Sequence, residues 1–231
     1  MNTLSSKLGH LVVIEGADGI GKSTQLELLR QKFVALGHTV TTYDFPHKSD
    51  SKLGELIGEF LKGNFGEVTP EFLALAFSLD RLESKERLLT DLQSGNIVLC
   101  DRYVSSNVAF QTSKIDDIAR RHRLKELLIW LEYELFKLPK PNFEIILTAT
   151  ETYFAEGHHR ERDKDIKRSY LGDKVTDIHE EAHTLQIRVN DFYSECKDSD
   201  YIKKISILDE SSKRIPANEI HSKILSACRL I

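Results

Sequence analysis

The sequence predicts an α/β domain of three layers, in which a five-stranded parallel sheet lies between two layers of helices. The prediction depends on short apolar runs that alternate along the chain with longer segments whose apolar residues recur at helical spacing. The chain has 231 residues, of which 40% are hydrophobic, and this is enough to build the core of one sizeable domain. We therefore expect a single domain over residues 1–231.

Five segments are predicted to be strands. They are residues 10–15, 38–45, 96–101, 143–149 and 201–208. The first of them, HLVVIE, is a continuous apolar run that stops at a glycine-rich loop, which is typical of a strand buried on both faces. The second is rich in β-branched residues and ends at Pro46. Because helical segments separate these runs, neighbouring strands are expected to be parallel.

The predicted helices have their own start and stop signals. They are residues 23–36, 51–63, 70–95, 123–138 and a last segment from about 216 to 230. The first stops at Gly37, and the long third one has Pro70 at its start and Gly95 after its end. Residues 156–174 are highly charged, and we interpret them as a lid over a site, with an ordinary solvated loop as the alternative.

The composition argues against several classes of partner. The formal net charge is −4, so the chain has no general positive field that would attract nucleic acid. No apolar run approaches the roughly 20 residues that span a bilayer, and the first residues do not have the pattern of a signal peptide. Cys100, Cys196 and Cys228 are widely spaced, which indicates reduced thiols. We therefore expect a cytoplasmic protein with neither a nucleic-acid nor a membrane partner.

The glycine-rich loop after the first predicted strand has a specific spacing. Residues 16–24 read GADGIGKST and match the pattern G-x-x-x-x-G-K-[ST], with a strand predicted before the loop and a helix after it. Glycines let the backbone curl around an anion, and the N–H groups of the loop and of the helix start then point toward that anion. We expect a nucleoside triphosphate to bind Gly16, Ala17, Asp18, Gly19, Ile20, Gly21, Lys22, Ser23 and Thr24.

Two further residues are predicted at the same edge of the sheet as this loop. Asp101 and Arg102 follow a buried run, so they are expected where the carboxyl ends of the parallel strands meet. Lys22 would reach the terminal phosphates, and Ser23 would bind Mg²⁺, with Asp101 as a second ligand, directly or through water. Arg102 would contact phosphate oxygens. A surface ion pair is the alternative for Asp101 and Arg102.

A second binding surface is indicated by two residues of the long predicted helix. Phe77 and Arg81 are four positions apart in AFSLDR, so they share one face of a helix. Phe77 could stack on a base, and Arg81 could reach the polar edge of that base. When the pair is taken alone, a core phenylalanine beside a surface arginine is the simpler interpretation.

Several blocks of the sequence together resemble the thymidylate kinases. They are VVIEGADGIGKSTQ (12–25), FPHKSDSKLGELIGEFLKGNFG (45–66), LALAFSLDR (73–81), DRYVSSNVAFQ (101–111), LPKPNFEIIL (138–147) and YLGDKVTDIHE (170–180). The blocks occur in the order found in the family and cover most of residues 10–195. The resemblance implies a P-loop fold of the nucleoside monophosphate kinase type and a homodimer. It also implies transfer of a phosphoryl group from ATP to dTMP with Mg²⁺.

The resemblance also implies which residues bind dTMP. They are Asp18, Phe45, Pro46, Lys48, Phe77, Arg81, Arg102, Ser106, Asn107 and Phe110. Asp18 matches the carboxylate that contacts the sugar 3′-hydroxyl and the region of the phosphates and metal. Phe77 matches the ring that stacks on thymine. Arg81 matches the arginine that reaches the thymine carbonyl, and Arg102 matches the arginine that holds the monophosphate.

The remaining positions of this set concern the pyrimidine edge and the sugar. Ser106 and Asn107 match positions near the N3 edge of the pyrimidine. Phe110 matches a ring that crowds the 2′ position of the sugar and so favours deoxyribose. Lys48 stands where the family usually has an arginine on the acceptor phosphate, and lysine supplies the charge without the two-pronged fork.

Catalysis in the family is attributed to positive charge around the two phosphate groups. The implied catalytic residues are Asp18, Lys22, Arg102, Arg160, Arg162 and Arg168. The acceptor phosphate is mostly a dianion at neutral pH, so it needs no general base, and cations offset the repulsion between the two nucleotides. Gly19 replaces a basic loop residue of one family branch, and the other branch supplies that charge from the lid. Which of the three lid arginines does so stays open.

Three alternatives to a dTMP kinase also stay open. A related kinase could prefer dUMP, UMP or dCMP, because one methyl group contributes little to binding. A nucleotide-regulated binding protein could keep the glycine loop without turnover. Residues 179–183 read HEEAH and match the H-E-x-x-H pattern of zinc hydrolases, with His179 and His183 on one helical face and Glu180 as the base.

Overall fold

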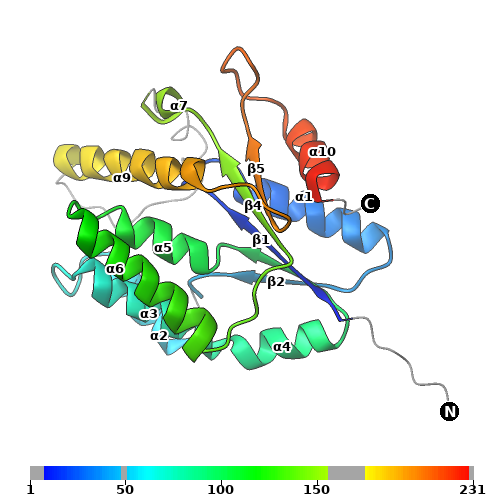
Figure 1. Cartoon of the computed structure of the whole chain (residues 1–231), viewed down its shortest axis with the longest axis horizontal. Helices are drawn as coiled ribbons and strands as arrows, with labels where there is room; N and C mark the ends of the chain where they lie inside the picture. The colour runs from blue at the N-terminus through cyan, green and yellow to red at the C-terminus, as the bar shows by residue number, and fades with distance from the viewer. Residues whose placement is uncertain (1–7, 48–50, 156–174, 229–231) are drawn as a thin grey trace.

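A parallel sheet of five strands runs through the computed structural model, which describes residues 8–47, 51–155 and 175–228. The strands are β1 (His10–Glu15), β2 (Val40–Asp44), β3 (Ile97–Asp101), β4 (Phe143–Thr148) and β5 (Ile202–Ser206). Their order in the sheet is β2-β3-β1-β4-β5, and every neighbouring pair is parallel (Figure 1). The five-stranded parallel sheet expected from the sequence is confirmed.

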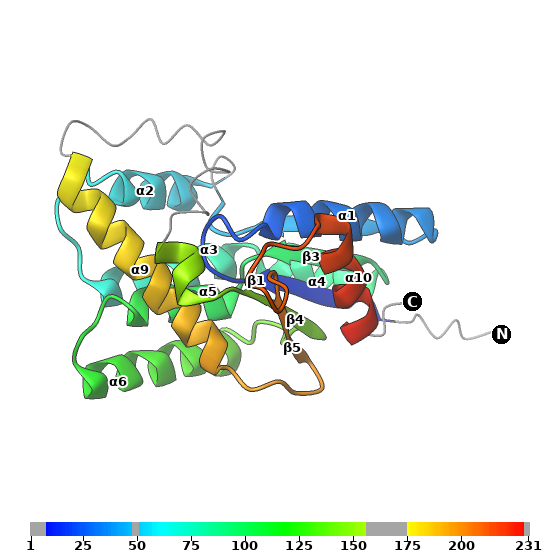
Figure 2. The ribbon, with the colours of Figure 1, turned by 90° about the horizontal axis from the view of Figure 1, so that it is seen from above.

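Helices cover both faces of this sheet. They are α1 (Lys22–Ala35), α2 (Lys52–Leu61), α3 (Pro70–Glu83), α4 (Lys85–Gln93), α5 (Val104–Thr112), α6 (Ile118–Ile129), η1 (Trp130–Leu135), α7 (Glu151–Ala155), α9 (Val175–Glu195) and α10 (Ala217–Cys228). Helices α2, α3, α5 and α9 gather beyond the carboxyl ends of the strands (Figures 1 and 2). Across the three described ranges, none of the helices combines the length and apolar character needed to cross a membrane.

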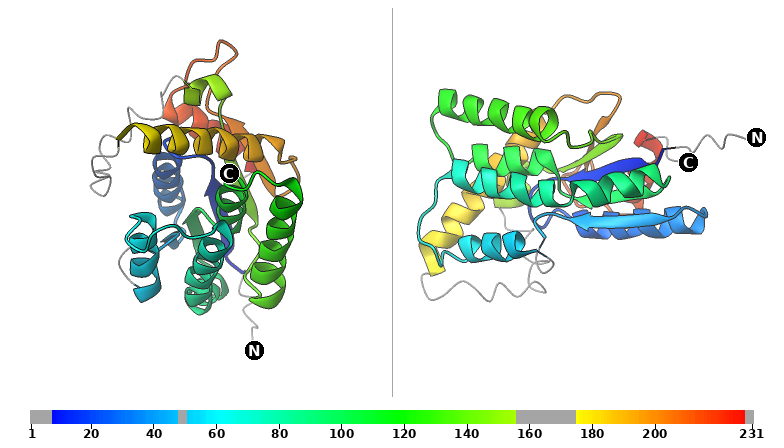
Figure 3. Two further views of the ribbon diagram at one scale, coloured as in Figure 1. Left: turned by 90° about the vertical axis from the view of Figure 1, so that its left-hand side faces the viewer. Right: turned by 90° about the horizontal axis from the view of Figure 1, so that it is seen from below.

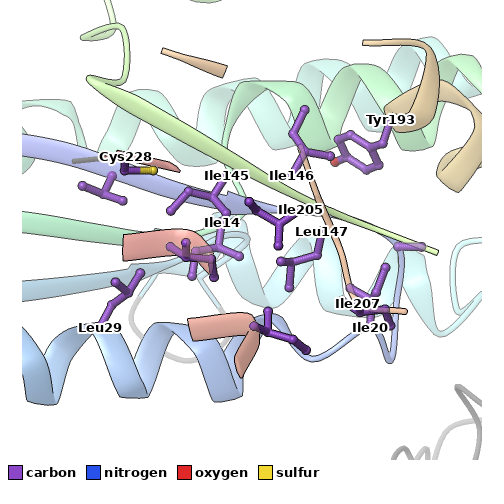
Figure 4. Packing of buried hydrophobic residues seen from close by; sticks show 14 of the residues in the cluster. Ile14, Ile20, Leu29, Ile145, Ile146, Leu147, Tyr193, Ile205, Ile207 and Cys228 are labelled. Carbon is purple, nitrogen blue, oxygen red and sulfur yellow. The ribbon is translucent and has the colours of Figure 1, made fainter. Parts of the chain in front are cut away.

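Side chains of β1 alternate between two separate apolar clusters, one on each face of the sheet. Val12 and Ile14 pack with residues of α1 and α10, whereas Leu11 and Val13 pack with residues of α4 and α5. Figure 4 shows part of the first cluster, in which Leu29 of α1 faces the strands. A strand whose two faces are both covered by helices lies in the middle of three layers, so the predicted three-layer architecture is confirmed.

A smaller apolar cluster holds three helices together outside the sheet. Its members are Ala74 of α3, Val108 of α5, Ile115, and Leu124 and Leu128 of α6. Arg120 at the start of α6 also forms an ion pair of 2.6 Å with Glu71 at the start of α3. Helix α9 lies across the same end of the molecule and contacts α5 (Figure 3). The helices that border the functional site are therefore fixed to one another as well as to the sheet.

The long helix predicted over residues 70–95 is in fact two helices. Ser84 separates α3 from α4, and it is buried. Its hydroxyl lies 3.1 Å from Nε2 of His47, a residue 37 positions earlier in the chain. Because the helical spacing of apolar residues continues through Ser84, the local pattern contained no sign of the break. The break coincides with the contact between Ser84 and His47, which are distant in the sequence.

The helix predicted over residues 123–138 has different ends in the structure. Helix α6 begins after Asp117, whose carboxylate caps it by accepting a hydrogen bond from the backbone nitrogen of Arg120 at 2.6 Å. The helix then widens into the π-helix η1 for its last six residues. The short helix α5 was not predicted as a separate element, because its segment is rich in serine, valine and asparagine rather than in strong helix formers.

Candidate active site

The loop between β1 and α1 has a backbone that only glycines adopt readily. Gly16, Gly19 and Gly21 have φ values of 139°, 71° and 104°. A Cβ atom on Gly16 would lie 2.7 Å from the carbonyl oxygen of Leu147, so a larger residue would not fit there. Helix α1 begins at Lys22, directly after the loop, so its free N–H groups add to those of the loop. This is the geometry of an anion-binding loop.

Lys22 lies buried against the glycine loop. Its Nζ donates a hydrogen bond to the carbonyl oxygen of Ala17 at 2.8 Å. Burial, together with the positive charge of Arg102, lowers the pKa of Lys22 from 10.5 to about 8. The amine is therefore less firmly protonated than an ordinary lysine, and an anion bound in the loop would favour its charged form.

Ser23 and Asp101 come together beside the loop, as the sequence predicts for a metal site. The hydroxyl of Ser23 donates a hydrogen bond to Oδ2 of Asp101 at 3.2 Å. The other carboxylate oxygen, Oδ1, is buried and has no hydrogen-bond partner in the described part of the chain. Hydroxyl and carboxylate oxygens are the ligands that Mg²⁺ takes, usually with several waters. The residues present therefore fit this ion.

A cleft of about 300 Å³ opens beside the loop. Its apolar walls are Phe45, Pro46, Leu61, Phe77, Phe110 and Leu185. Its polar walls are Asp18, Arg81, Arg102, Ser106, Asn107, Gln111, Lys114 and Gln186. The cleft thus brings together every residue expected to bind the acceptor nucleotide except Lys48, which lies outside the described residues. It also contains residues that were not predicted, of which Gln186 is the most closely connected to the loop.

Arg102 connects the glycine loop to the cleft. Its backbone is left-handed, with a φ of 68°, which is uncommon for a residue other than glycine. One guanidinium nitrogen bonds to Oδ1 of Asp18. Another donates to Oγ of Ser106 at 3.1 Å and to the carbonyl oxygen of Gly16 at 3.3 Å. The guanidinium carbon also lies 4.7 Å from the centre of the Phe110 ring. These contacts hold the Arg102 charge at the boundary between loop and cleft.

A buried carboxylate that the sequence analysis missed supports this arrangement. Glu15, the last residue of β1, is fully buried. It accepts hydrogen bonds from the backbone nitrogens of Tyr103 and Ser106, at 2.8 and 3.3 Å, and from the hydroxyl of Ser106. The hydroxyl of Tyr193 on α9 donates a further bond at 2.8 Å. The signal in the sequence was a single acidic residue at the end of an otherwise apolar strand.

Gln186 on α9 is a second residue that the sequence analysis missed. Its Oε1 accepts a hydrogen bond from the backbone nitrogen of Asp18 at 2.7 Å, and its Nε2 donates one to Oδ2 of Asp18 at 2.8 Å. The two residues are 168 positions apart, so no local motif connects them. Gln186 thereby fixes both the backbone and the side chain of the loop residue that faces Arg102.

Arg81 lines the cleft, as expected, but its charge already has a partner. Its Nε and Nη2 donate to the two carboxylate oxygens of Glu132 on η1, each at 2.5 Å. Arg81 is 2% exposed and Glu132 is fully buried. Glu132 was not predicted from the sequence, because an acidic residue inside an apolar helix has no local pattern that reveals its partner. Arg81 is therefore not the surface arginine of the simpler interpretation. It lines the cleft, but its charge is paired with Glu132.

Several predicted residues cannot be placed. Lys48, the lid over residues 156–174 and its Arg160, Arg162 and Arg168 lie outside the described residues. The H-E-x-x-H pattern belongs to α9, but no side chain is described for its first histidine or its glutamate. Nε2 of His183 lies 2.6 Å from the carbonyl oxygen of Phe154. Among the side chains that the structure does describe, no three or more His, Cys, Asp or Glu are grouped to hold a metal ion.

A parallel sheet whose first strand leads into an anion-binding glycine loop, with a cleft beside that loop, is typical of a P-loop nucleotide kinase. The sequence profile of one family, described as thymidylate kinase, matches residues 14–169. The chain belongs to the thymidylate kinase family, and so to the nucleoside monophosphate kinases, which are phosphotransferases.

Individual thymidylate kinases support this assignment. The chain is 29% identical to the enzyme of Mycobacterium tuberculosis over 190 residues, which is 80% of this chain and 84% of that protein. It is 31% identical to the enzyme of Clavibacter sepedonicus over 175 residues, which is 71% and 81% of the two chains. The solved structure of the Candida albicans enzyme matches with a TM-score of 0.69 at 23% identity and shows the same fold. That match covers 96% of this chain and 92% of the other.

The lowered pKa of Lys22 predicts how ATP affinity changes with pH. An anion in the loop raises this pKa again, so binding takes up a proton wherever free Lys22 is deprotonated. Affinity should be nearly constant below pH 7 and should fall by up to about tenfold per pH unit above the free pKa of about 8. Titration calorimetry between pH 6.5 and about 9.5, in two buffers of different ionisation enthalpy, measures both effects.

The control for this prediction is Lys22→Met, which removes the titrating amine. The variant should bind ATP more weakly at every pH and should lack the step near pH 8. An ATP affinity that stays constant from pH 7 to 9.5 in the unmodified protein would contradict the assignment of Lys22 to the phosphates.

Proposed function

We propose that the protein transfers the γ-phosphoryl group of ATP to dTMP, giving dTDP and ADP. The observation that carries the proposal is the bond between Asp18 of the glycine loop and Arg102 of the cleft. Through it, an anion-binding loop and a cleft with an aromatic wall share one boundary. Two nucleotides bound at this boundary would bring their phosphates together, as in-line transfer requires.

Positive charge from the chain's own residues would carry most of the catalysis. An oxygen of the acceptor phosphate is already anionic at neutral pH, so the obstacle is repulsion between two anions rather than loss of a proton. Lys22 would neutralise the donor phosphates from the loop side. Arg102, held by Asp18 and Ser106, would neutralise the acceptor phosphate from the cleft side. Both cations are in place before transfer, so little reorganisation is needed.

We also propose that Mg²⁺ binds with the ATP. The Ser23 hydroxyl and the Asp101 carboxylate, which has one buried oxygen without a described partner, would hold it. When bound, the ion neutralises charge on the β- and γ-phosphates. The lid arginines Arg160, Arg162 and Arg168 are proposed to add charge to the same region.

The cleft accounts for dTMP as the acceptor. The exposed part of Phe77 can stack on a pyrimidine ring, and Arg81 and Asn107 lie on the wall that its polar edge would face. Phe110 is proposed to crowd the sugar, because its ring lies against Arg102, where the acceptor phosphate is expected. Phe45, Pro46 and the charge of Lys48 are proposed to complete the acceptor site.

The direct test supplies purified protein with Mg²⁺, ATP and one of five monophosphates, namely dTMP, dUMP, UMP, dCMP and dGMP. We expect dTDP and ADP in equal amounts, with dTMP preferred, and no product when EDTA removes Mg²⁺. Chromatographic separation of the nucleotides measures this. The panel matters because the Candida albicans relative is described as having a broad substrate specificity. Absence of dTDP, or faster turnover of UMP or dCMP, would overturn the proposal.

The proposed role of Phe110 predicts the behaviour of Phe110→Ala. Removing the ring makes room for a 2′-hydroxyl, so the preference for dUMP over UMP, as a ratio of kcat/KM values, should fall by about tenfold. The matched control is Phe77→Ala, which removes a ring proposed to contact the base. It should weaken dUMP and UMP equally and leave their ratio unchanged. An unchanged ratio in Phe110→Ala removes Phe110 from sugar selection.

We further propose that the protein is a homodimer that pairs through α3. Phe72, Leu75 and Leu79 are 49%, 43% and 46% exposed, and their spacing puts them on one face of the helix. Leu127 of the adjoining α6 is 44% exposed. An apolar surface of this kind marks an interaction site. Burying it against the same surface of a second copy would give a two-fold symmetric contact.

Charge placed in this surface should separate the copies. In the Leu75→Glu variant, dimer formation would bury a carboxylate without a partner, so the dissociation constant of the dimer should increase by about 100-fold or more. Light scattering after size exclusion should give about twice the 26.4 kDa chain mass for the unmodified protein and the single mass for the variant. Leu36→Glu, at a leucine 49% exposed just after α1, is the control and should remain dimeric. A monomeric unmodified protein contradicts the proposal.

A cytoplasmic location is proposed on the cysteine chemistry. All three cysteines are free thiols in the structure, and two of them are buried in apolar surroundings. Free thiols suit a reducing compartment.

A further inference from the structure

We infer that Glu132 is a positioning residue that sets which groups of the cleft wall donate hydrogen bonds and which accept them. It orients Arg81, whose guanidinium can only donate, and it helps to keep the Oδ1 atom of Asn107 available as an acceptor. Through this pair it selects thymine over cytosine, a role that rests on the proposed dTMP site. Glu132 itself does not line the cleft and would not touch the substrate.

The pairing of Arg81 with Glu132 determines which guanidinium nitrogen is left for a ligand. Nε and Nη2 both donate to the carboxylate, in the two-pronged geometry that orients the whole planar group. The hydrogen bonds that Arg81 makes within the described part of the chain use Nε and Nη2, which leaves Nη1 for a ligand, and Arg81 lines the cleft. Arg81 therefore presents N–H groups to the cleft and can only donate there.

Glu132 also fixes the orientation of a neighbouring amide. Nδ2 of Asn107 lies 2.9 Å from the carbonyl oxygen of Ala74, 3.1 Å from Oγ of Ser78 and 3.1 Å from Oε1 of Glu132. Two of these three neighbours, a carbonyl and a carboxylate, can only accept hydrogen bonds. If the amide were turned over, its oxygen would face both of them. The NH₂ group is therefore directed at Glu132, and the oxygen is directed elsewhere.

The oxygen of that amide is the unsatisfied group. Oδ1 of Asn107 is buried and has no hydrogen-bond partner within the described ranges, although Asn107 lines the cleft and is only 3% exposed. A buried polar atom without a partner is costly unless a ligand supplies one. The lining of the cleft thus includes a donor, Arg81, and an acceptor, Asn107.

This order of donor and acceptor matches one pyrimidine edge and opposes another. Thymine carries an acceptor oxygen at C4 next to a donor N–H at N3, so both of its groups would find a partner. Cytosine carries an amine donor at C4 and an acceptor at N3, so both contacts would be between like groups. A site built to pair with specific polar groups rejects an analogue that leaves them unpaired. Discrimination therefore depends on the orientation that Glu132 imposes.

The test variant is Glu132→Gln, which keeps the shape of the side chain. It removes the charge that pairs with Arg81 and replaces one of the two acceptor-only groups that face the Asn107 NH₂ group, so of these two only the Ala74 carbonyl still holds the amide orientation. We expect the dTMP to dCMP ratio of kcat/KM to fall by about tenfold or more, mainly through a higher KM for dTMP. The kcat for dTMP should change by less than about threefold, because the phosphate groups are not touched.

Two further variants separate positioning from a merely structural role. Glu144→Gln makes the same substitution at another buried glutamate, on β4, where burial and the charge of Glu15 raise the pKa to about 7. It should leave the dTMP to dCMP ratio unchanged. Ser78→Ala removes one hydrogen bond to Glu132 and one from the Asn107 amide, and it should lower the ratio by about threefold. Ser78→Ala also tests the inference if Glu132→Gln does not fold.

The ratio is informative because it does not depend on the fraction of folded enzyme. Loss of folded protein lowers both kcat/KM values equally, so an unchanged ratio in Glu132→Gln and Ser78→Ala overturns the inference. Calorimetric affinities for dTMP and dCMP, measured without ATP, should shift in the same sense. If the unmodified protein makes no dTDP and binds no dTMP, it is the proposed function that fails. If it makes dTDP and the variants keep its selectivity, only the role of Glu132 fails.

Discussion

The geometry of both nucleotide sites depends on the buried carboxylate of Glu15. A charge at the inner end of β1 would be destabilising by on the order of several kcal/mol if it were left without partners. Four hydrogen bonds satisfy it, and their donors are Tyr103, Ser106 and Tyr193. One ion thereby fixes the start of α5 and the last turn of α9 against the strand that leads into the glycine loop. The left-handed backbone of Arg102 is held between these fixed points.

The two cleft arginines differ in how their charges can be used. Arg81 and Glu132 are both buried, with side chains 2% and 0% exposed, so water has little access to their pair and the pair orients the guanidinium. Asp18, the partner of Arg102, has a side chain that is 35% exposed, so solvent or a phosphate can compete for Arg102. In the cleft, the charge of Arg81 is therefore neutralised by a buried protein carboxylate, whereas the charge of Arg102 is available to a ligand. This difference agrees with their expected positions, since Arg81 is expected at the base and Arg102 at the acceptor phosphate.

The strands and the glycine loop were predictable because their signals are local. Apolar runs identify buried strands, and the spacing of Gly16, Gly21 and Lys22 identifies an anion loop. The acceptor residues came from resemblance to a family, and the described ones line one cleft. The break at Ser84 and the π-helix η1 could not be predicted, because tertiary contacts accompany both. Glu15, Gln186 and Glu132 were missed for the same reason, since their partners are distant in the sequence.

The position of Asp18 has a thermodynamic consequence. Its carboxylate bonds to Arg102 on the acceptor side and to Gln186 on α9, while its backbone belongs to the donor loop. A nucleotide that moves Asp18 from either side alters the surroundings of the other nucleotide. Linkage then requires that the coupling be reciprocal: the factor by which the donor changes acceptor affinity equals the factor by which the acceptor changes donor affinity. The total binding free energy is the same whichever substrate arrives first, and the contacts of Asp18 contribute to the size and sign of the coupling.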